Sequence, residues 1–527
     1  MFFQLYCRSR RIGDCSLRTY TPEILEQIED IINIGIALSA EKDKNRVLEM
    51  IVSEARRITH ADAGTLYLCE NESLSFKIMQ NESMNTFLGG RGEKINIPPV
   101  PLKMENVSAY AAITHKSVNI PNVYQAKEFD FSGPKKFDES TGYHTLSMLV
   151  IPLENHEEEV IGVLQLINAR DENGKLIPFA PYLENVITSL ASQAAIAISH
   201  MQLVADIEEL FNSFVQVMAT AIDSRTPYTA NHTRRVALLA GEMARAINRQ
   251  IQGYWAGVAF SEEQVAQLEM AGWLHDIGKI ATPLEVMNKS TRIEHQLELV
   301  LQRFDYILSN SEAEYLKEKQ ALLAINSNDS REQMEQLERA WEDKQHYIKE
   351  SREFIIKVDH PSTFVNQEIV EKLKEIAVQS YWDGSGKLQP WLQENELKCL
   401  CVSKGTLTEQ ERKIMEDHVV VTGKMLEKIP FTKKLKDVPF FASIHHEHLN
   451  GRGYPQGLSG KQIPLEGRIL ALVDVFDALT ASDRPYKKAL PLEQALKILG
   501  FMVKDGELDG ELLQLLIEQR VWENILD

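Results

Sequence analysis

The C-terminal half of the chain contains an ordered series of histidines and aspartates, and this series constrains the fold more than any other feature. Five of the fourteen histidines take part, together with two aspartates: His232, His275, Asp276, His418, His445, His446 and Asp474. Taken singly, such a histidine is more often a structural residue than a ligand. As an ordered set in a helical context, these residues favour a fold that gathers them into one metal site.

The segment HDIGK at 275–279 shows why a metal is expected. The apolar run MAGWL before it predicts a buried helix, and a His-Asp pair at the end of such a helix is costly without a partner. A divalent ion removes this cost, and mixed imidazole and carboxylate ligands suit Fe, Mn, Zn or Co. A carboxylate can also bridge two ions. If the helix continues, Lys279 lies on the face of His275, where its ammonium could neutralise a phosphate oxygen.

Two further segments contribute candidate site residues. The adjacent histidines at 445–446 would point about 100° apart on a helix. They could serve two metals, or one metal and one substrate oxygen. In DVFDALTASDRPYKKA, Asp474 and Asp477 are three residues apart on a predicted helix, and the cations Arg484 and Lys487 follow. These two cations could hold phosphates.

Length and composition limit the classes of protein to consider. A chain of 527 residues predicts two or three domains. The net charge of -19 argues against a nucleic-acid polymer as partner, although a local basic pocket could bind a small anionic nucleotide. No apolar run approaches the ~18 to 20 residues that span a bilayer. The five cysteines lack a disulfide framework. We therefore expect a cytoplasmic protein without membrane insertion.

The first part of the chain predicts one α+β module. Residues 1–20 are expected to be a disordered leader. A helical pattern runs from about Thr21 to Arg57, and four β-type runs follow at 65–69, 74–79, 146–152 and 160–168. Helix, strands and a closing helix suggest a single module up to about residue 180.

A long helix is predicted from about Pro181 to Ala221. Apolar residues recur at three- and four-residue spacing from Leu183 to Met201, and the repeat slips near Val204. Such a helix either pairs with its copy in a dimer or packs on its own domain.

The chain is predicted to be almost wholly helical from residue 211 onward. The stretch at about 290–403 is rich in Glu, Gln and Lys, which predicts inserted amphipathic helices with a solvated face. Within it, WDGSGKLQPW predicts a loop.

Five segments of the C-terminal half resemble the HD-GYP subgroup of the HD phosphohydrolase superfamily. They are DSRTPYTANHTRRV, HDIGKI, LTEQERKIMEDH, HHEHLNGRGYPQGLSGKQIP and RILALVDVFDALTASDRPYKKA. The resemblance covers about 211–289 and 405–500. It implies an all-α phosphodiesterase with two or three metal ions, commonly iron or manganese, that hydrolyses cyclic di-GMP to pGpG or GMP. The alternatives are a different cyclic dinucleotide, such as cyclic GMP-AMP, and a non-catalytic receptor that acts through protein partners.

The resemblance also assigns roles to residues by position. The seven residues of the series would be metal ligands, with Asp276 bridging two ions. Asp276 and Lys279 are the candidate catalytic residues. The expected substrate-binding residues are Lys279, Asp477, Arg484, Lys487, Gly453, Tyr454 and Pro455.

Three departures from the family pattern matter. Some members hold a third ion with a glutamate four residues before the first histidine, and here that position is Tyr228, which favours two ions. Asn450 stands where an aspartate is frequent. The insertion at 290–403 separates HDIGKI from His418 and is expected to loop out of the helical core.

The N-terminal half resembles a GAF domain through GPKKFDESTGYHTLSMLVIPL and VIGVLQLINA. Phe137 and Asp138 lie near the part of the family pattern that helps to form a ligand pocket. This implies either a small-ligand sensor or a structural dimer module. The expected organisation is multidomain: an α+β GAF domain at 21–180 with an antiparallel sheet, a linker helix at 181–210, and an all-α HD-GYP domain at 211–527. We expect a homodimer through the GAF domain and the linker helix.

Overall fold

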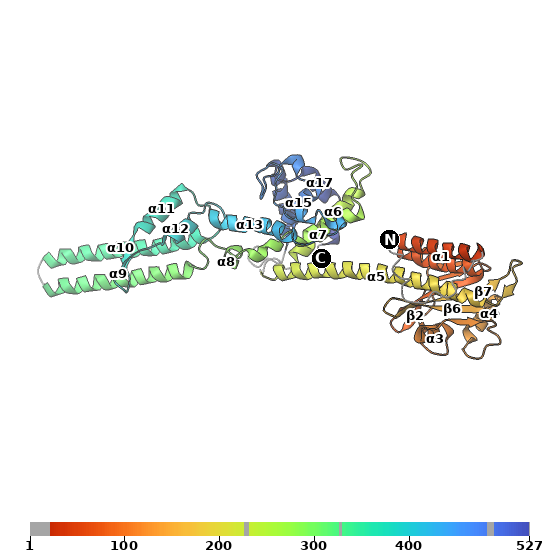
Figure 1. Cartoon of the computed structure of the whole chain (residues 1–527). Helices are drawn as coiled ribbons and strands as arrows, with labels where there is room; N and C mark the ends of the chain where they lie inside the picture. The colour runs from red at the N-terminus through yellow and green to blue at the C-terminus, as the bar shows by residue number, and fades with distance from the viewer. Residues whose placement is uncertain (1–21, 226–230, 326–328, 482–489, 526–527) are drawn as a thin grey trace, which may run out of the picture. The chain divides into compact units, whose positions relative to one another are not determined.

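The computed structural model divides the chain into two compact units, Met1–Leu210 and Phe211–Asp527 (Figure 1). The structure describes residues 22–225, 231–325, 329–481 and 490–525. The leader predicted at 1–20 lies outside these ranges. Helix α5 (Pro181–Asp223) crosses the boundary between the units. None of the described helices is both long and apolar enough to cross a membrane.

The N-terminal unit is an antiparallel sheet with helices on both faces. Its elements are α1 (Pro22–Ala40), α2 (Lys44–Thr59), β1 (Ala61–Glu70), β2 (Ser73–Asn81), β3 (Thr86–Gly89), β4 (Val100–Pro101), α3 (Val107–Thr114), β5 (Val118–Ile120), α4 (Ser132–Thr141), β6 (Met148–Glu154), β7 (Val160–Arg170) and β8 (Leu176–Ile177). The strand order is β3-β2-β1-β7-β6-β5, with β4 paired to β2 and β8 paired to β7. The four predicted strands are present as β1, β2, β6 and β7. The helix predicted from Thr21 to Arg57 is two helices, because Asp43 caps the start of α2.

Successive side chains along each strand point to opposite faces of the sheet, so this unit has two apolar layers, one on each face. Leu66 and Leu164 pack under α1, α2 and α5, whereas their neighbours Tyr67 and Val163 pack on the opposite face against α3. The apolar series of α5 that begins at Leu183 is buried in the first of these layers. For that part of α5, packing on its own domain is the correct alternative.

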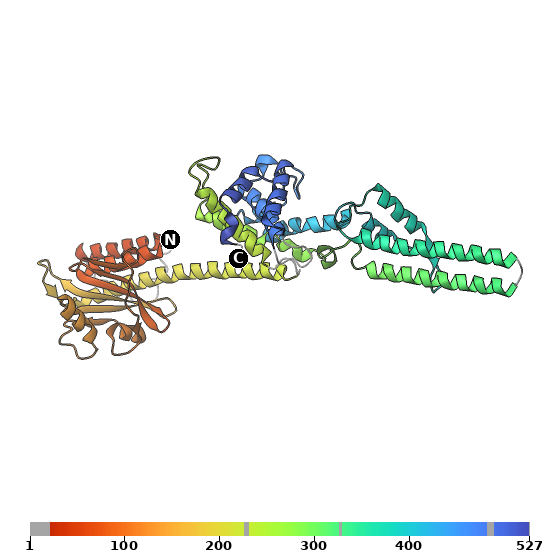
Figure 2. The same ribbon diagram turned by 180° about the vertical axis from the view of Figure 1, so that it is seen from behind.

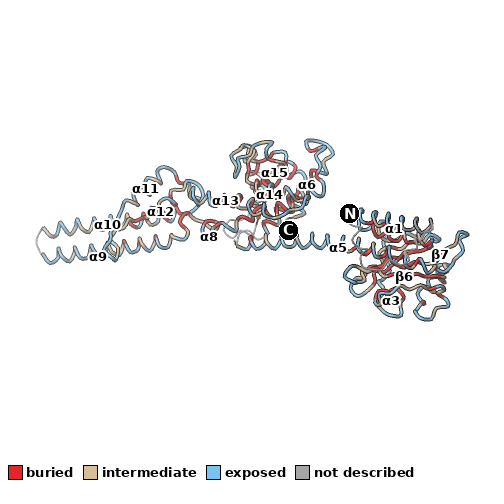
Figure 3. Tube along the Cα trace, viewed as in Figure 1, coloured by how far each residue is buried: buried red, intermediate tan, exposed pale blue. Residues whose placement is uncertain are grey.

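The C-terminal unit is built around one helical core. Its elements outside the insertion are α6 (His232–Asn248), α7 (Glu262–Leu274), η1 (Ile277–Ala281), α8 (Leu284–Met287), α13 (Glu409–Leu426), η2 (Lys433–Leu435), α14 (Val438–Ala442), η3 (Gly460–Gln462), α15 (Leu465–Thr480), α16 (Leu492–Lys504), α17 (Gly510–Glu518) and η4 (Val521–Asn524). Helices α6, α7, α15 and α17 supply much of the core, and Figure 3 shows the buried residues gathered there. A Cβ on Gly272 would lie 2.7 Å from Ala237 Cα, so α6 and α7 approach closely at this glycine.

The insertion has a hydrophobic core of its own. Its elements are α9 (Leu297–Ile325), α10 (Asp329–Asp359), α11 (Gln367–Val378), β9 (Ser380–Trp382), β10 (Leu388–Pro390) and α12 (Glu394–Leu400). Helices α9 and α10 run side by side in both views (Figures 1 and 2). The insertion is not purely helical, because WDGSGKLQPW forms the turn of a hairpin in which Asp383 accepts hydrogen bonds from Ser385 N and Lys387 N. The expected fold class is otherwise confirmed: an antiparallel α+β domain precedes an all-helical region.

The two chain ends of the insertion are fastened together at its base. Arg292 is fully buried and donates to the carbonyls of Val358, His360, Thr363 and Val402. A second set of contacts joins Lys289 to α13. Its ammonium pairs with Glu411 at 2.7 Å, and its carbonyl accepts a hydrogen bond from Thr406 Oγ1. The insertion therefore leaves and rejoins the helical core at one place.

Candidate metal centre

Six of the seven residues in the predicted series form two adjoining groups of possible metal ligands. One group comprises His232, His275 and Asp276, and the other comprises His418, His445 and His446. Within each group the ligand atoms lie within 4.8 Å of one another. The fold therefore brings together residues from four separate segments of the chain.

Asp276 lies between the two groups and directs one carboxylate oxygen to each. Its Oδ2 is 3.3 Å from His275 Nε2 and 3.8 Å from His232 Nε2. Its Oδ1 is 3.3 Å from His418 Nε2 and 4.0 Å from His445 Nε2. Although burial opposes ionisation, His275 and Lys279 hold the pKa of Asp276 well below its usual range. A carboxylate with this geometry is suited to bridge two cations.

Three of the histidines are oriented by the same local device. The Nδ1 of each donates to the carbonyl three residues earlier: His275 to Gly272 at 2.7 Å, His418 to Met415 at 2.6 Å and His445 to Ala442 at 2.8 Å. This fixes the tautomer that leaves Nε2 free to bind a metal. Within the described part of the chain, these three Nε2 atoms and Asp276 Oδ1 are buried without a hydrogen-bond partner. Such orphaned atoms are costly, and divalent ions would satisfy them.

His232 is held by a different partner, an aspartate on α15. Its Nδ1 donates to Asp477 Oδ2 at 2.7 Å, and Arg235 Nε lies 2.5 Å from the other oxygen of Asp477. Its Nε2 is 3.2 Å from Asp474 Oδ1, and this brings the seventh residue to the first group. Burial opposes the charged form, but Asp474 and Asp477 raise the pKa of His232 to about 10. A metal at Nε2 would compete with that proton.

Asp477, which was expected to bind substrate, lies behind His232. Its side chain is fully buried, and its two oxygens face His232 and Arg235. It is therefore placed to hold a candidate ligand in position, and its expected contact with substrate stays a prediction.

Asp477→Asn should weaken metal binding by about 10–100-fold, the usual loss when an outer partner of a metal ligand is removed. The amide keeps the shape of the side chain but cannot supply the charge that Arg235 and His232 both face. Titration of the metal-free protein with Mn²⁺ measures the effect. Unchanged affinity, with the fold intact by circular dichroism, would contradict this role.

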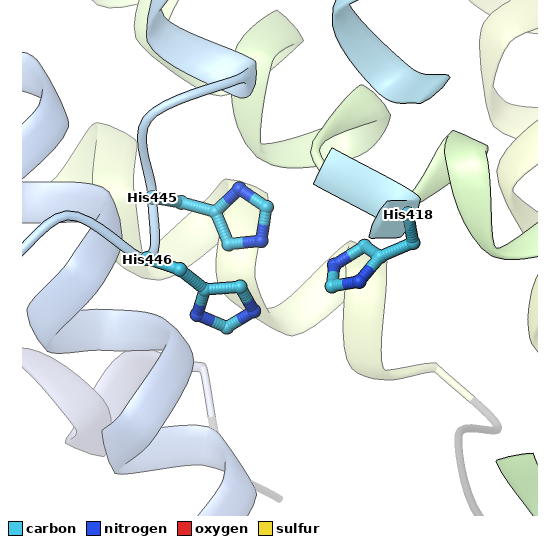
Figure 4. Close-up of side chains that lie close together, drawn as sticks. All are labelled: His418, His445 and His446. Carbon is cyan, nitrogen blue, oxygen red and sulfur yellow. The ribbon is translucent and has the colours of Figure 1, made fainter. Parts of the chain in front are cut away.

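The adjacent histidines do not lie on a helix as expected. Helix α14 ends at Ala442, and His445 and His446 follow in a turn. In Figure 4 their rings converge with that of His418, which comes from α13. Burial lowers the pKa of His446 to about 4 and that of His445 well below its usual value, so both are neutral and suited to bind a metal.

The loop after the histidine pair is folded back onto it. A Cβ on Gly453 would lie 2.3 Å from His448 N and 2.5 Å from His446 O, so only glycine fits. Tyr454 N donates to His446 O at 3.1 Å, and the two rings lie 4.9 Å apart. Glu447, which the sequence analysis missed, is buried and accepts from the backbone of Gln456 and Leu458. Glu447 directly follows the histidine pair, and this position is the sequence feature that could have identified it.

The HDIGK segment docks on α13 through two small residues that the sequence analysis also missed. Gly278 N donates to Thr422 Oγ1 at 3.0 Å, and this hydroxyl donates to His275 O at 3.0 Å. A Cβ on Gly278 would lie 2.0 Å from His418 O. Close contact between η1 and α13 is thus what places His418 beside Asp276.

Lys279 lies at the centre, but not on the helical face that the sequence predicted. Helix α7 ends at Leu274 and a 3₁₀ turn follows, so Lys279 does not continue the helical face of His275. Its ammonium instead pairs with Asp276 Oδ2. Burial opposes its charge, but Asp276 raises the pKa of Lys279, which stays cationic.

Comparison with known families agrees with the two units. A GAF domain model matches residues 43–198. Two HD domain models match residues 229–372 and 395–512. The chain carries a GAF domain and an HD domain.

Known relatives match only part of this chain. The 3'3'-cGAMP-specific phosphodiesterase 3 of Vibrio cholerae is 42% identical over 96 residues, or 18% of this chain and 20% of that protein. The cyclic di-GMP phosphodiesterase response regulator RpfG of Xanthomonas campestris is 42% identical over 95 residues, or 18% and 25%. The cyclic di-GMP phosphodiesterase of Thermotoga maritima is 37% identical over 100 residues, or 19% and 26%. The matches thus span a fifth to about a quarter of these relatives.

Several expected residues of the HD domain lie outside the described part of the chain. These are the two candidate phosphate-binding cations, Arg484 and Lys487, and Tyr228, the position of the third-metal glutamate. Asn450, the other departure from the pattern, donates to Asp505 O at 3.0 Å and accepts from Arg452 N, so it holds the loop.

The two residues proposed for a GAF-domain pocket have different environments. Asp138 is buried, and its oxygens accept from Tyr124 Oη and from the backbone and hydroxyl of Thr145. It therefore fastens α4 to the loop before β6, and its expected role in a ligand pocket stays a prediction. Phe137 is exposed on α4.

Proposed function

We propose that the HD domain is a metal-dependent phosphodiesterase that hydrolyses a cyclic dinucleotide. The observation that carries this proposal is Asp276, whose two oxygens face two groups of histidines, three of which have a buried Nε2 without a hydrogen-bond partner. The printed names of the relatives support the substrate class, since they specify cyclic di-GMP and 3'3'-cGAMP. Both compounds are therefore candidate substrates, with cyclic di-GMP hydrolysed to pGpG, GMP or both.

The residues present fit two divalent ions. His232, His275 and Asp474 would hold one, and His418, His445 and His446 the other, with Asp276 shared. Imidazole and carboxylate ligands suit iron or manganese. When bound, the ions would activate a water and polarise the phosphoryl oxygens of the scissile diester. A third ion is not favoured, because Tyr228 replaces the glutamate that would help to bind it.

The chain's own residues would orient the substrate and balance its charge. Lys279 pairs with Asp276 Oδ2, the oxygen that faces the first group. If that oxygen held a cation, the ammonium of Lys279 would be available to neutralise a phosphoryl oxygen. Arg484 and Lys487 would hold further phosphate oxygens. Tyr454 and Pro455, whose loop is held in place by Glu447 and Gly453, would form one wall beside His446.

We also propose that the GAF domain regulates this activity, as a sensor or as a dimer module in a homodimer. Helix α5 supports the proposal because it begins in the N-terminal unit and ends at Asp223, whose carboxylate accepts a hydrogen bond from Thr233, next to His232. Deleting residues 1–205 should change activity or oligomeric state. No change in either would contradict regulation through α5.

The deciding experiment incubates the purified full chain, loaded with Mn²⁺ or Fe²⁺, with cyclic di-GMP and with 3'3'-cGAMP. We expect a linear product from at least one of them, resolved by chromatography. His275→Ala should abolish product formation because it removes a ligand, whereas His156→Ala, at an exposed site in the GAF domain, should have no effect.

Two results would contradict the enzyme assignment. The first is the absence of a linear product from either nucleotide. The second is equal product from His275→Ala and the unmodified chain. Tight nucleotide binding without turnover would instead identify a receptor.

A further inference from the structure

Helix α6 begins at the candidate ligand His232, but the residue before it does not cap the helix. The first amides of a helix have no carbonyl partner within it, and the side chain of the preceding residue usually accepts from one of them. Asp43 does so for α2, where it accepts from Asn45 N and Arg46 N. At the same position of α6, Asn231 has a φ of 65°, and its side chain caps none of the described amides of that helix. The turn that carries His232 therefore needs a cap from elsewhere.

Asp223 supplies this cap from the end of α5. Its Oδ2 accepts from Thr233 N at 3.3 Å and also from the hydroxyl of Thr233. Both residues are buried, and a buried donor or acceptor that loses its partner is costly. A carboxylate at the N-terminus of a helix is also favoured by the helix dipole. Because Thr233 directly follows His232, the cap holds the helix at the candidate ligand itself.

Arg225 holds the other segment of the first group, which comprises the HDIGK turn. Its Nη1 donates to Lys279 O at 3.1 Å and to Ile280 O. Both carbonyls belong to η1, which directly follows Asp276. Basic side chains commonly bond the carbonyls at the end of a helix in this way. Asp223 and Arg225 thus fasten both segments of the first group to one short stretch of chain, whereas α13 and the turn after α14 supply the second group.

We propose that Asp223 and Arg225 are positioning residues for the first of the two proposed ions. Asp223 fixes the turn that carries His232, and Arg225 fixes the turn that follows Asp276. The inference rests on the proposed function and deepens it, because it names residues outside the predicted series on which one ion site depends. Asp223 acts as a hydrogen-bond acceptor in this role, since it is not among the described residues whose ligand atoms gather around His232.

Two substitutions of Asp223 separate an acceptor from a charged ligand. Asparagine caps a helix about as well as aspartate does, whereas alanine does not. Asp223→Ala should therefore weaken one Mn²⁺ by about 10–100-fold, as loss of an outer partner usually does, and weaken the other less. Asp223→Asn should keep both ions, and Arg225→Ala should weaken the same ion as Asp223→Ala. The EPR signal of unbound Mn²⁺ follows these titrations of the metal-free full chain.

Hydrogen exchange of the metal-free full chain tests the cap without any ion. The amides of residues 233–236 should lose protection by about fivefold in Asp223→Ala, the usual effect of a lost cap, and keep it in Asp223→Asn. Ser261→Ala is the matched control, because it removes the N-cap of α7 in the same domain, at the end of that helix remote from His275. This control should leave the exchange of α6 and the binding of both ions unchanged.

Three results would overturn the positioning role. They are unchanged exchange of α6 in Asp223→Ala, equal weakening of both ions, and an Asp223→Asn variant that loses as much metal as Asp223→Ala. The last would show that the charge of the carboxylate matters and not its capping bond. An unmodified chain that binds no Mn²⁺ would instead contradict the proposed function, and the exchange measurement would still decide whether Asp223 caps α6.

Discussion

Replacing Asp276 with asparagine is expected to abolish phosphodiesterase activity and to deplete the bound metal. The amide keeps the volume of the carboxylate but removes its charge and one acceptor oxygen. Because each oxygen of Asp276 faces a different pair of histidines, both proposed ions would lose a ligand at once. The loss of activity should exceed ~100-fold, the upper end of what is seen when only an outer partner of a ligand is removed.

Metal analysis of the purified variant and steady-state turnover measure this prediction. Asp343→Asn, an exposed position on α10, is the matched control and should retain both metal and activity. Thermal unfolding provides an independent readout, since a ligand that binds only the folded state raises its stability. Mn²⁺ should raise the melting temperature of the unmodified chain and not that of Asp276→Asn. An active, metal-replete Asp276→Asn variant would refute the bridging role.

Gly278→Ala is expected to damage the centre through packing alone. The added Cβ would lie 2.0 Å from His418 O and 2.6 Å from Thr422 N, and both are backbone atoms of α13 that cannot move aside cheaply. Overpacking of this kind costs about 1–3 kcal/mol. Separation of η1 from α13 should also draw His418 away from Asp276 and lower metal affinity.

Denaturant unfolding and Mn²⁺ titration give the two readouts for this variant. The matched control is Gly500→Ala on α16, where a Cβ meets nothing within 4 Å. It should be neutral or slightly stabilising, because alanine favours a helix by ~1 kcal/mol over glycine. If Gly278→Ala binds Mn²⁺ as tightly as the unmodified chain, the contact between η1 and α13 does not set the position of His418.

The sequence predicted the composition of the centre better than its geometry. The seven residues that the motif order singled out lie close together in the structure, and their role as metal ligands stays a prediction. The backbone conformation around these residues was predicted less well from the sequence. Lys279 and the pair at 445–446 were placed on helices, but α7 ends at Leu274 and α14 ends at Ala442.

Two aspartates make contacts that the sequence analysis did not predict. Asp477 pairs with His232, 245 positions away, whereas Asp138 accepts hydrogen bonds from Thr145, only seven positions away. The first pairing depends on tertiary packing, which no local pattern encodes. The same limit applied to α5, where only the tertiary structure shows that the apolar series beginning at Leu183 packs on the domain's own core.

The stem of the insertion bears on how domains of this kind change length. Lys289 and Thr406 are hydrogen-bonded neighbours, although 117 positions separate them. Deleting residues 290–405 and joining the ends by a short linker would therefore remove the whole insertion. Helices α8 and α13 would keep their positions. The same junction offers a place to insert a reporter or an affinity module into the HD domain while the residues of the candidate metal centre on both sides of the insertion keep their positions.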